Sequence, residues 1–427
     1  MRHHSRTTIL SEEKDPLRSK RLFISLSTIA FCIWFYIGIA PALTYLFFRS
    51  NPPVAGQITA VFLGIVALLL AIGGVFGDRR EFAKIIGILP VGTIILYTAW
   101  TGATVLWTGA PKEIALVYWL ILVLKLYVVV RVLACKSREE ISWSSLKGFA
   151  WSGLIFALVP LIAGETDDEG RLGNEEFLHP NTIGNQLALT SLSSICLALQ
   201  APGKPQQRLV YIFMLTVQLF TLFRSLSKTS IFCFLLSATV YIIRSKISVK
   251  KKLLITVVAA GVIAVSYPLV ATYLDSYLNN QQGGEALETA TGRSAIWEMT
   301  WDYITQNPIL GYGFQSYRYT APQIIGVRLV HAHNDALNIW YTVGGIGLAL
   351  AVLTYLGYIF CWIRAAYRGS PQDALGLALL LYGLVRGLTE ASVDELTTYA
   401  TPLMLLVAQW MALSKPNDGI VKLITGI

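Results

Sequence analysis

Apolar residues in this sequence gather in blocks of about twenty, which is enough to cross about 30 Å of hydrocarbon as a helix. The connections between the blocks are mostly short and polar. The pattern predicts an all-α polytopic membrane protein with about twelve transmembrane helices. The predicted spans are residues 23–48, 55–76, 82–107, 112–134, 144–164, 181–200, 208–226, 228–245, 251–274, 334–363, 374–393 and 396–414.

Two connections are much longer than the others. The stretch GETDDEGRLGNEEFLHPN, around residues 165–180, is acidic, and the segment 275–333 is the longest polar stretch of the chain. Connections of that length in a compact protein are usually functional. We therefore divide the chain into a tail 1–22, nine spans in 23–274, a long outer loop 275–333, three spans in 334–414 and a tail 415–427.

The long loop contains a helical pattern of its own. In RSAIWEMTWDYITQNP the apolar positions recur at helical spacing, and Asn307-Pro308 ends the run. The residues at this spacing are Ile296, Trp297, Thr300, Trp301 and Ile304. We predict an amphipathic helix in the outer headgroup region, where tryptophan is favoured. A glycine turn, ILGYGF, follows it.

Charge gives the orientation of the spans. Of the 34 Lys and Arg residues, 24 fall on alternate connections that share one side with both termini, and eight fall on the other side. By the positive-inside rule both termini of this multi-pass protein are cytoplasmic, and the long loop lies on the outer side of the membrane. The net charge of +9 then reflects contact with anionic lipid, and it does not indicate nucleic acid. The apolar stretch of the first span is about twice as long as the h-region of a signal peptide and further spans follow, so we expect it to stay uncleaved.

Metal and disulfide chemistry are not indicated. The five cysteines lie in or near the cytoplasmic ends of spans without paired spacing. The run Asp167, Asp168 and Glu169 is interpreted as a solvated acidic loop rather than a metal site, because no fixed ligand geometry is implied. We expect no cofactor.

Candidate chemistry begins in HAHNDALNIWYTVGGIGL, residues 331–348. Asn334 is placed to cap the tenth span, and Asp335 lies in its first turn, where a carboxylate complements the helix dipole. His331 and His333 then precede the helix at the outer surface. They are either capping and headgroup contacts or a base, because a neutral histidine can accept a proton from a hydroxyl.

Cations are scarce on the outer side, but three stand at structured positions. Arg224 and Lys228 flank a tight turn and are one helical turn apart if the backbone there is helical, and Arg293 opens the amphipathic helix. Each alone is equally consistent with a snorkelling side chain. As a set they suit a diphosphate. Arg386 and Glu390 lie one turn apart in a span, and we expect an internal ion pair there with no catalytic role.

These stretches carry a resemblance. HAHNDALNIWYTVGGIGL is similar to the HxHN-x-x-L…G-x-x-G signature of the O-antigen ligase and polymerase superfamily. TGRSAIWEMTWDYITQNPILGYGF resembles its GR-x-x-x-W…NP-x-x-G-x-G-F block, SLSKTS its S-x-S-[RK]-T turn, and LHPNTIGNQLAL its HPN segment. The four motifs occur in the family's order between about residues 165 and 350.

The resemblance implies a metal-independent, inverting glycosyltransferase of the C class. The family's histidine falls on His333, its loop arginine on Arg293 and its turn cation on Lys228, where many members have Arg. We add Arg224 because it shares the turn, with His331 and Asn334 beside His333. Weaker candidates for sugar or diphosphate contact are Arg171, His179 and Asn181.

The implied reaction transfers a polysaccharide from undecaprenyl diphosphate to the lipid A-core oligosaccharide, as an O-antigen ligase does. An O-antigen or exopolysaccharide polymerase that joins lipid-linked repeat units fits equally well by motif, and we favour the ligase. The resemblance implies that either reaction takes place at the periplasmic face of the bacterial inner membrane. A transporter for a lipid-linked sugar is a rival from another class, but transporters generally place ionisable residues near the midplane of the bilayer. A membrane scaffold whose outer loop docks a partner is a third alternative.

Overall fold

The computed structural model describes most of the chain, and all structural statements below refer to that part. The described residues are 25–48, 58, 61–66, 79–135, 138–167, 170–173, 178–201, 203–253, 293–321, 329–367, 372–391 and 400–413. The predicted spans 55–76 and 251–274 fall largely outside these residues, as does the first part of the long loop.

The described residues form helices joined by turns, with one isolated antiparallel bridge between Thr166 and Leu172. Six helical segments are long and apolar enough to cross a membrane, namely α1, α4 with the adjoining η2, α5, α6, α7 and α14. An all-α membrane protein is thereby confirmed, whereas the total of twelve spans stays a prediction. The elements are α1 (Leu26–Phe48), α3 (Arg79–Ile86), α4 (Leu89–Thr104), η2 (Val105–Trp107), α5 (Lys112–Leu133), α6 (Arg138–Ala163), α7 (Pro180–Gln200), α8 (Pro205–Arg224), α9 (Lys228–Arg244), α12 (Arg293–Gln306), α13 (Tyr317–Thr320), α14 (Asp335–Tyr367), α15 (Asp373–Gly387) and α16 (Ala400–Leu413).

Two of the predicted spans differ from the helices in the structure. The predicted span 82–107 is divided at Gly87 and Ile88 into the short α3 and the apolar α4, because Pro90 starts a new helix in its first turn. The predicted span 374–393 ends as the helix α15 at Gly387. Glu390 therefore lies in a turn beyond the helix and not inside it.

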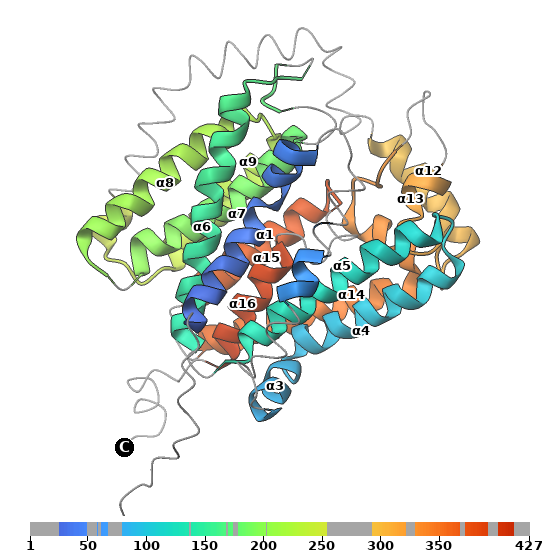
Figure 1. Cartoon of the computed structure of the whole chain (residues 1–427), viewed down its shortest axis with the longest axis horizontal. Coiled ribbons are helices and arrows are strands. Elements are labelled where there is room, and N and C mark those ends of the chain that lie inside the picture. Colours follow the sequence, from blue (N-terminus) through green and yellow to red (C-terminus); the bar gives the residue numbers. More distant parts are fainter. Residues whose placement is uncertain are drawn as a thin grey trace, which may run out of the picture.

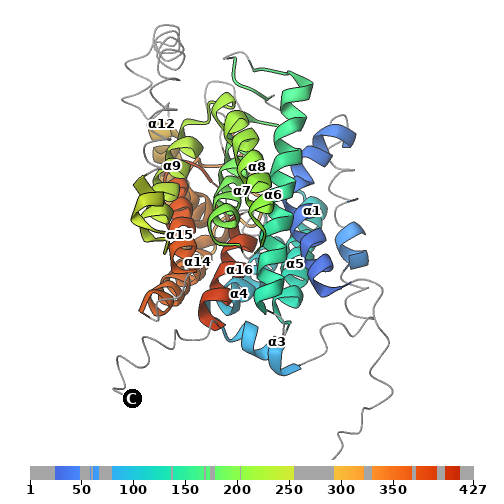
Figure 2. The same ribbon diagram turned by 90° about the vertical axis from the view of Figure 1, so that its left-hand side faces the viewer.

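The helices run side by side as a bundle, with α1 against α6, α7 against α8, α14 against α4 and α15 against α9 (Figure 1). The short α3 lies at one end of the bundle and α12 at the opposite end in both views (Figure 2). Helix α7 is the most enclosed of the six long apolar segments. Its first turn, which carries Asn181, is therefore held by packing on several sides.

Buried polar groups fix α7 within the bundle. Gln186 donates to the carbonyl of Gly38 in α1 at 2.6 Å. Ser194 donates to Gln218 of α8 at 3.0 Å, and Gln218 donates in turn to the carbonyl of Ala150 in α6 at 2.8 Å. Hydrogen bonds between helices are favourable where lipid offers no alternative partner. These bonds fix α7 relative to α1 and α8, and they fix α8 in turn relative to α6.

The polar connections lie at the two ends of the bundle, in the two groups that the distribution of Lys and Arg predicts. At one end, Glu81 pairs with Arg138, and Arg244 pairs with Asp373 at 2.5 Å. At the other end, the amide of Leu172 donates to the carbonyl of Arg224 at 3.1 Å. Connections predicted on the same side thus contact one another. Which end faces the periplasm remains a prediction.

Helix α14 is broken at Gly344, which has φ 71° and ψ −177°. The break leaves backbone carbonyls without helical donors, and other segments supply them. The amides of Tyr312 and Gly313 donate to the carbonyls of Tyr341 and Thr342 at 2.8 and 2.7 Å. Non-helical backbone within a membrane helix is tolerated where other protein segments satisfy its polar groups. The predicted glycine turn after α12 is confirmed, and its role is to dock the loop onto this break.

Replacing Gly344 should therefore destabilise the protein. A Cβ there would lie 2.1 Å from the carbonyl oxygen of Ile309, and φ is in the left-handed region. We expect Gly344→Ala to cost more than about 1 kcal/mol and to lower the thermal midpoint of the detergent-purified protein. Gly64→Ala is the matched control, since a Cβ at Gly64 meets nothing within 4 Å. Equal midpoints for the two variants would contradict this account of the break.

Candidate functional site

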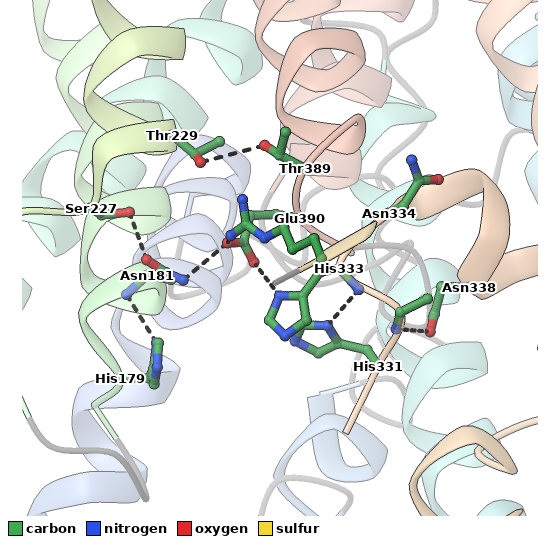
Figure 3. A network of polar contacts seen from close by, with 12 residues as sticks. His179, Asn181, Ser227, Thr229, His331, His333, Asn334, Asn338, Thr389 and Glu390 are labelled. Carbon is green, nitrogen blue, oxygen red and sulfur yellow. Dashed lines mark hydrogen bonds and ion pairs between the residues drawn. The ribbon is translucent and has the colours of Figure 1, made fainter. Parts of the chain in front are cut away.

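A buried carboxylate, that of Glu390, collects donors from several distant segments. Its side chain is 4% exposed. Arg293 donates from Nη2 to Oε1 at 2.7 Å, and Asn181 donates from Nδ2 to the same oxygen at 3.0 Å. The ring atom Nδ1 of His333 lies 3.5 Å from Oε2 (Figure 3). One carboxylate therefore brings the predicted histidine and the predicted loop arginine together.

We call Asn181, Ser227, Arg293, His333 and Glu390 the Glu390 cluster. Ser227 belongs to it because its hydroxyl donates to Oδ1 of Asn181 at 3.1 Å. The members come from the first turn of α7, the turn before α9, the first residue of α12, the segment before α14 and the turn after α15. Four of the sequence motifs thus meet at one place (Figure 3).

The segment that carries His333 is held on both sides. The amide of His333 donates to Nδ1 of His331 at 3.2 Å, and the two rings lie edge to face with centroids 4.2 Å apart. Between them, Ala332 accepts from Nε1 of Trp297 in α12 at 3.1 Å and donates to Oδ1 of Asn338 at 3.1 Å. His333 itself has φ 51°. Left-handed backbone at a non-glycine residue persists only where the surroundings enforce it, and it is common at functional sites.

Asn334 caps α14, as predicted. Its Oδ1 accepts from the amide of Leu337 at 3.0 Å. Its Nδ2 donates to the carbonyl of Leu388 at 3.1 Å. The cap therefore also ties the start of α14 to the turn that presents Glu390. A hydroxyl contact of 3.4 Å between Thr389 and Thr229 joins the same turn to α9 (Figure 3).

The cluster is electrostatically asymmetric. Burial alone would raise the pKa of Glu390, but the contact with His333 and the charges of Arg386 and Arg293 lower it to about 2. Glu390 is therefore ionised at neutral pH. Burial of the ring, reinforced by His333, lowers the pKa of His331 to about 3, so His331 is neutral. The side chain of His333 is 29% exposed, so part of its ring is accessible from outside the cluster.

The same residues include the set that by distance alone would suit a metal ion. Candidate ligand atoms of His331, His333 and Glu390 all lie within 4.8 Å of one another. However, Arg293 already occupies Oε1 of Glu390 and Arg386 adds a second positive charge nearby. A cation placed there would face both guanidinium groups. The negative charge of Glu390 is therefore already balanced by Arg293, and this arrangement does not favour a metal ion.

The weaker candidates lie around the cluster in structural roles. Arg171 is paired with Asp167 through Nε at 2.7 Å, within the acidic loop. His179 caps α7, accepting from the amide of Asn181 at 3.1 Å. Burial and the charge of Arg171 lower the pKa of His179. Of the three weaker candidates, Asn181 is the one that the structure brings to Glu390.

The turn cations do not form a helical pair. Arg224 is the last residue of α8 and Lys228 the first of α9, and Leu226 between them has φ 50°. The assumption of a helical backbone, under which both would face one ligand, is therefore wrong. Both side chains are exposed. Ser227 enters the Glu390 cluster between them.

Residues 210–352 match the family model described as O-antigen ligase. Over this segment the chain resembles the O-antigen ligase family. The resemblance indicated by the motifs is thereby confirmed, although the match does not distinguish ligases from polymerases. The matched segment contains Ser227, Arg293 and His333, while Asn181 and Glu390 lie outside this segment. No curated protein matches the chain.

The role of Glu390 in this cluster was not predicted from the sequence. The sequence predicts an internal ion pair with Arg386, and the carboxylate also contacts Arg293, Asn181 and His333. Arg386 acts on it through charge, and its carbonyl accepts from the amide of Glu390 at 2.9 Å. A usable signal was the position of Glu390 at the outer end of a span. Ser227 had no signal beyond its place in SLSKTS.

The link between Arg293 and Glu390 can be measured by a double-mutant cycle. Removing one partner of a buried pair leaves an uncompensated charge and costs about 3 kcal/mol, so Glu390→Gln and Arg293→Gln should each destabilise strongly. The double variant should be less destabilised than the sum, with a coupling energy of about 1–3 kcal/mol.

The measurement is the unfolding free energy in mixed micelles, obtained by denaturant titration. Glu298→Gln serves as the control, since Glu298 is exposed on the same helix as Arg293 and should change stability little. Additive effects of the two substitutions would show that the contact carries no net energy.

Proposed function

We propose that this protein is a metal-independent inverting glycosyltransferase that works as an O-antigen ligase. It would transfer a polysaccharide from undecaprenyl diphosphate to the lipid A-core oligosaccharide at the periplasmic face of the inner membrane. The observation that supports this best is the meeting of His333 and Arg293 on the carboxylate of Glu390. A base and a phosphate-binding group thus lie side by side, as a displacement reaction on a glycosyl diphosphate requires.

In the proposed reaction His333 is the general base. It takes the proton from an acceptor hydroxyl as that oxygen forms a bond to the anomeric carbon of the donor. The bond from the anomeric carbon to the diphosphate oxygen breaks, and its electron pair leaves with undecaprenyl diphosphate. Attack from the face opposite the leaving group inverts the anomeric centre.

Arg293 is proposed to stabilise the charge that develops on the diphosphate. A guanidinium has five N–H donors, so the bond to Glu390 leaves others for phosphate oxygens. Lys228 and Arg224 border the turn that carries Ser227 and would extend the positive field along the diphosphate. A lipid-linked donor enters from the bilayer, so no nucleotide-binding domain is needed.

Ligase and polymerase activity are separable in one assay. Purified protein is incubated with undecaprenyl-diphosphate-linked repeat units, with and without lipid A-core. A shift of the core band that needs both substrates supports the ligase. A ladder that grows on the carrier without lipid A-core supports the polymerase alternative, and no transfer under either condition contradicts both.

Loss of His333 should remove most of the rate. We expect His333→Ala to lower kcat on the order of 10²-fold or more with a folded, monodisperse protein. Turnover is measured with the assay above, and folding by the thermal midpoint in detergent. Near-normal turnover would mean that orientation and leaving-group stabilisation suffice without a base.

The scaffold alternative makes the opposite prediction for the cations. If the outer end docks a partner, Lys228→Gln should leave glycan transfer intact. As part of a diphosphate site, Lys228→Gln should weaken transfer about tenfold or more, whereas Lys228→Arg should retain it, because the charge is kept. Exposed Glu298→Gln again reports on non-specific effects of removing a charge.

A further inference from the structure

We propose that Glu390 and Asn181 are positioning residues for His333. The carboxylate of Glu390 holds the Nδ1 side of the ring, so that Nε2 is the nitrogen that receives the acceptor proton, and the amide of Asn181 fixes the carboxylate. This inference rests on the proposed function and assigns roles to two residues outside the family match.

The two oxygens of Glu390 have different partners. Oε1 accepts from both Arg293 and Asn181, at 2.7 and 3.0 Å. Oε2 is the oxygen that faces Nδ1 of His333 at 3.5 Å. The two donors on Oε1 set the plane of the carboxylate and direct Oε2 toward the ring of His333. In a neutral imidazole one nitrogen carries the proton and the other accepts, so a proton held at Nδ1 leaves Nε2 as the base.

The distance of 3.5 Å is longer than an ordinary N–H···O bond. Such contacts between catalytic groups often tighten when the substrate is bound. Because its other partners fix the carboxylate, only a small movement of the His333 ring is needed to shorten this contact.

Asn181 can present only its NH₂ group to Glu390. Its Oδ1 is occupied by the hydroxyl of Ser227 at 3.1 Å, which fixes the orientation of the amide. Its backbone amide is bonded to Nδ1 of His179 at 3.1 Å, in the cap of α7. Because α7 is enclosed by the bundle, Asn181 is a rigid support for the carboxylate.

The charged and titratable groups near His333 come from four elements. Glu390 and Arg386 approach from α15 and its turn, Arg293 from α12, His179 from the cap of α7, and His331 from its own segment. Arg318 of α13 acts on His331. Among them Glu390 is the negative group in contact with the ring. It would stabilise the imidazolium that forms on proton transfer, which an amide in its place would not.

The test compares three variants with wild type in the purified transfer assay. In Glu390→Gln we expect kcat to fall about 10²-fold while KM for the lipid-linked donor changes less than about threefold. Because the charge that favours the imidazolium is gone, the acidic limb of the pH–rate profile should move to lower pH. A purely structural role would not move this limb.

Asn181→Ala and Glu390→Asp separate orientation from charge. Asn181→Ala keeps the carboxylate, so kcat should fall about tenfold with the acidic limb at its wild-type position. Glu390→Asp restores the charge at shorter reach, so the limb should return to its wild-type position although kcat stays reduced. Asn181→Ala also keeps the test decisive if Glu390→Gln fails to fold.

The outcomes distinguish this inference from the proposed function. No transfer by wild type with either acceptor would remove the proposed function. Wild-type transfer combined with an unchanged kcat and acidic limb in Glu390→Gln would overturn the positioning role alone. If Glu390→Gln does not fold, an unchanged kcat in Asn181→Ala overturns it.

Discussion

The arrangement at this end of the bundle depends on one buried negative charge. A carboxylate that is 4% exposed costs several kcal/mol unless donors surround it. Glu390 obtains them from α12 and from α7, 97 and 209 residues away in sequence, and it faces His333 before α14. Ser227 fixes Asn181, His331 accepts from the amide of His333, and the cap of α14 holds the turn that carries Glu390. The cluster therefore follows from the need to provide hydrogen-bond donors for the buried carboxylate of Glu390.

A second constraint puts Arg293 within reach. The break at Gly344 opens carbonyls in the middle of a membrane helix, and the loop after α12 supplies the amides that satisfy them. Gly311 and Gly313, both with positive φ, allow that close approach. Trp297 then bonds to Ala332, between the two histidines. Docking the loop on the break thus places α12 over the start of α14, with its first residue at Glu390.

Local patterns predicted the elements but not this meeting point. Apolar blocks and capping residues set helix boundaries through neighbours in sequence, which is why α12, the glycine turn and the Asn334 cap were correctly predicted. Glu390 was assigned to Arg386 because residues four apart in a helix face each other. The helix ends at Gly387, and the carboxylate also contacts Arg293, which is 97 residues distant. Nothing in a single sequence encodes such a pairing.

The position of the cluster bears on how an enzyme of this kind would use charge. Inside the bundle the polar groups that fix α7 are neutral side chains that bond to backbone carbonyls or to each other. At the end, Glu390 offsets Arg293, while Arg224 and Lys228 remain exposed at the neighbouring turn. In the proposed reaction, these exposed cations and the guanidinium of Arg293 would both be available to the diphosphate of the donor. The carboxylate of Glu390 would then orient Arg293, because a guanidinium that is bonded to Glu390 can present only its remaining N–H groups to a diphosphate.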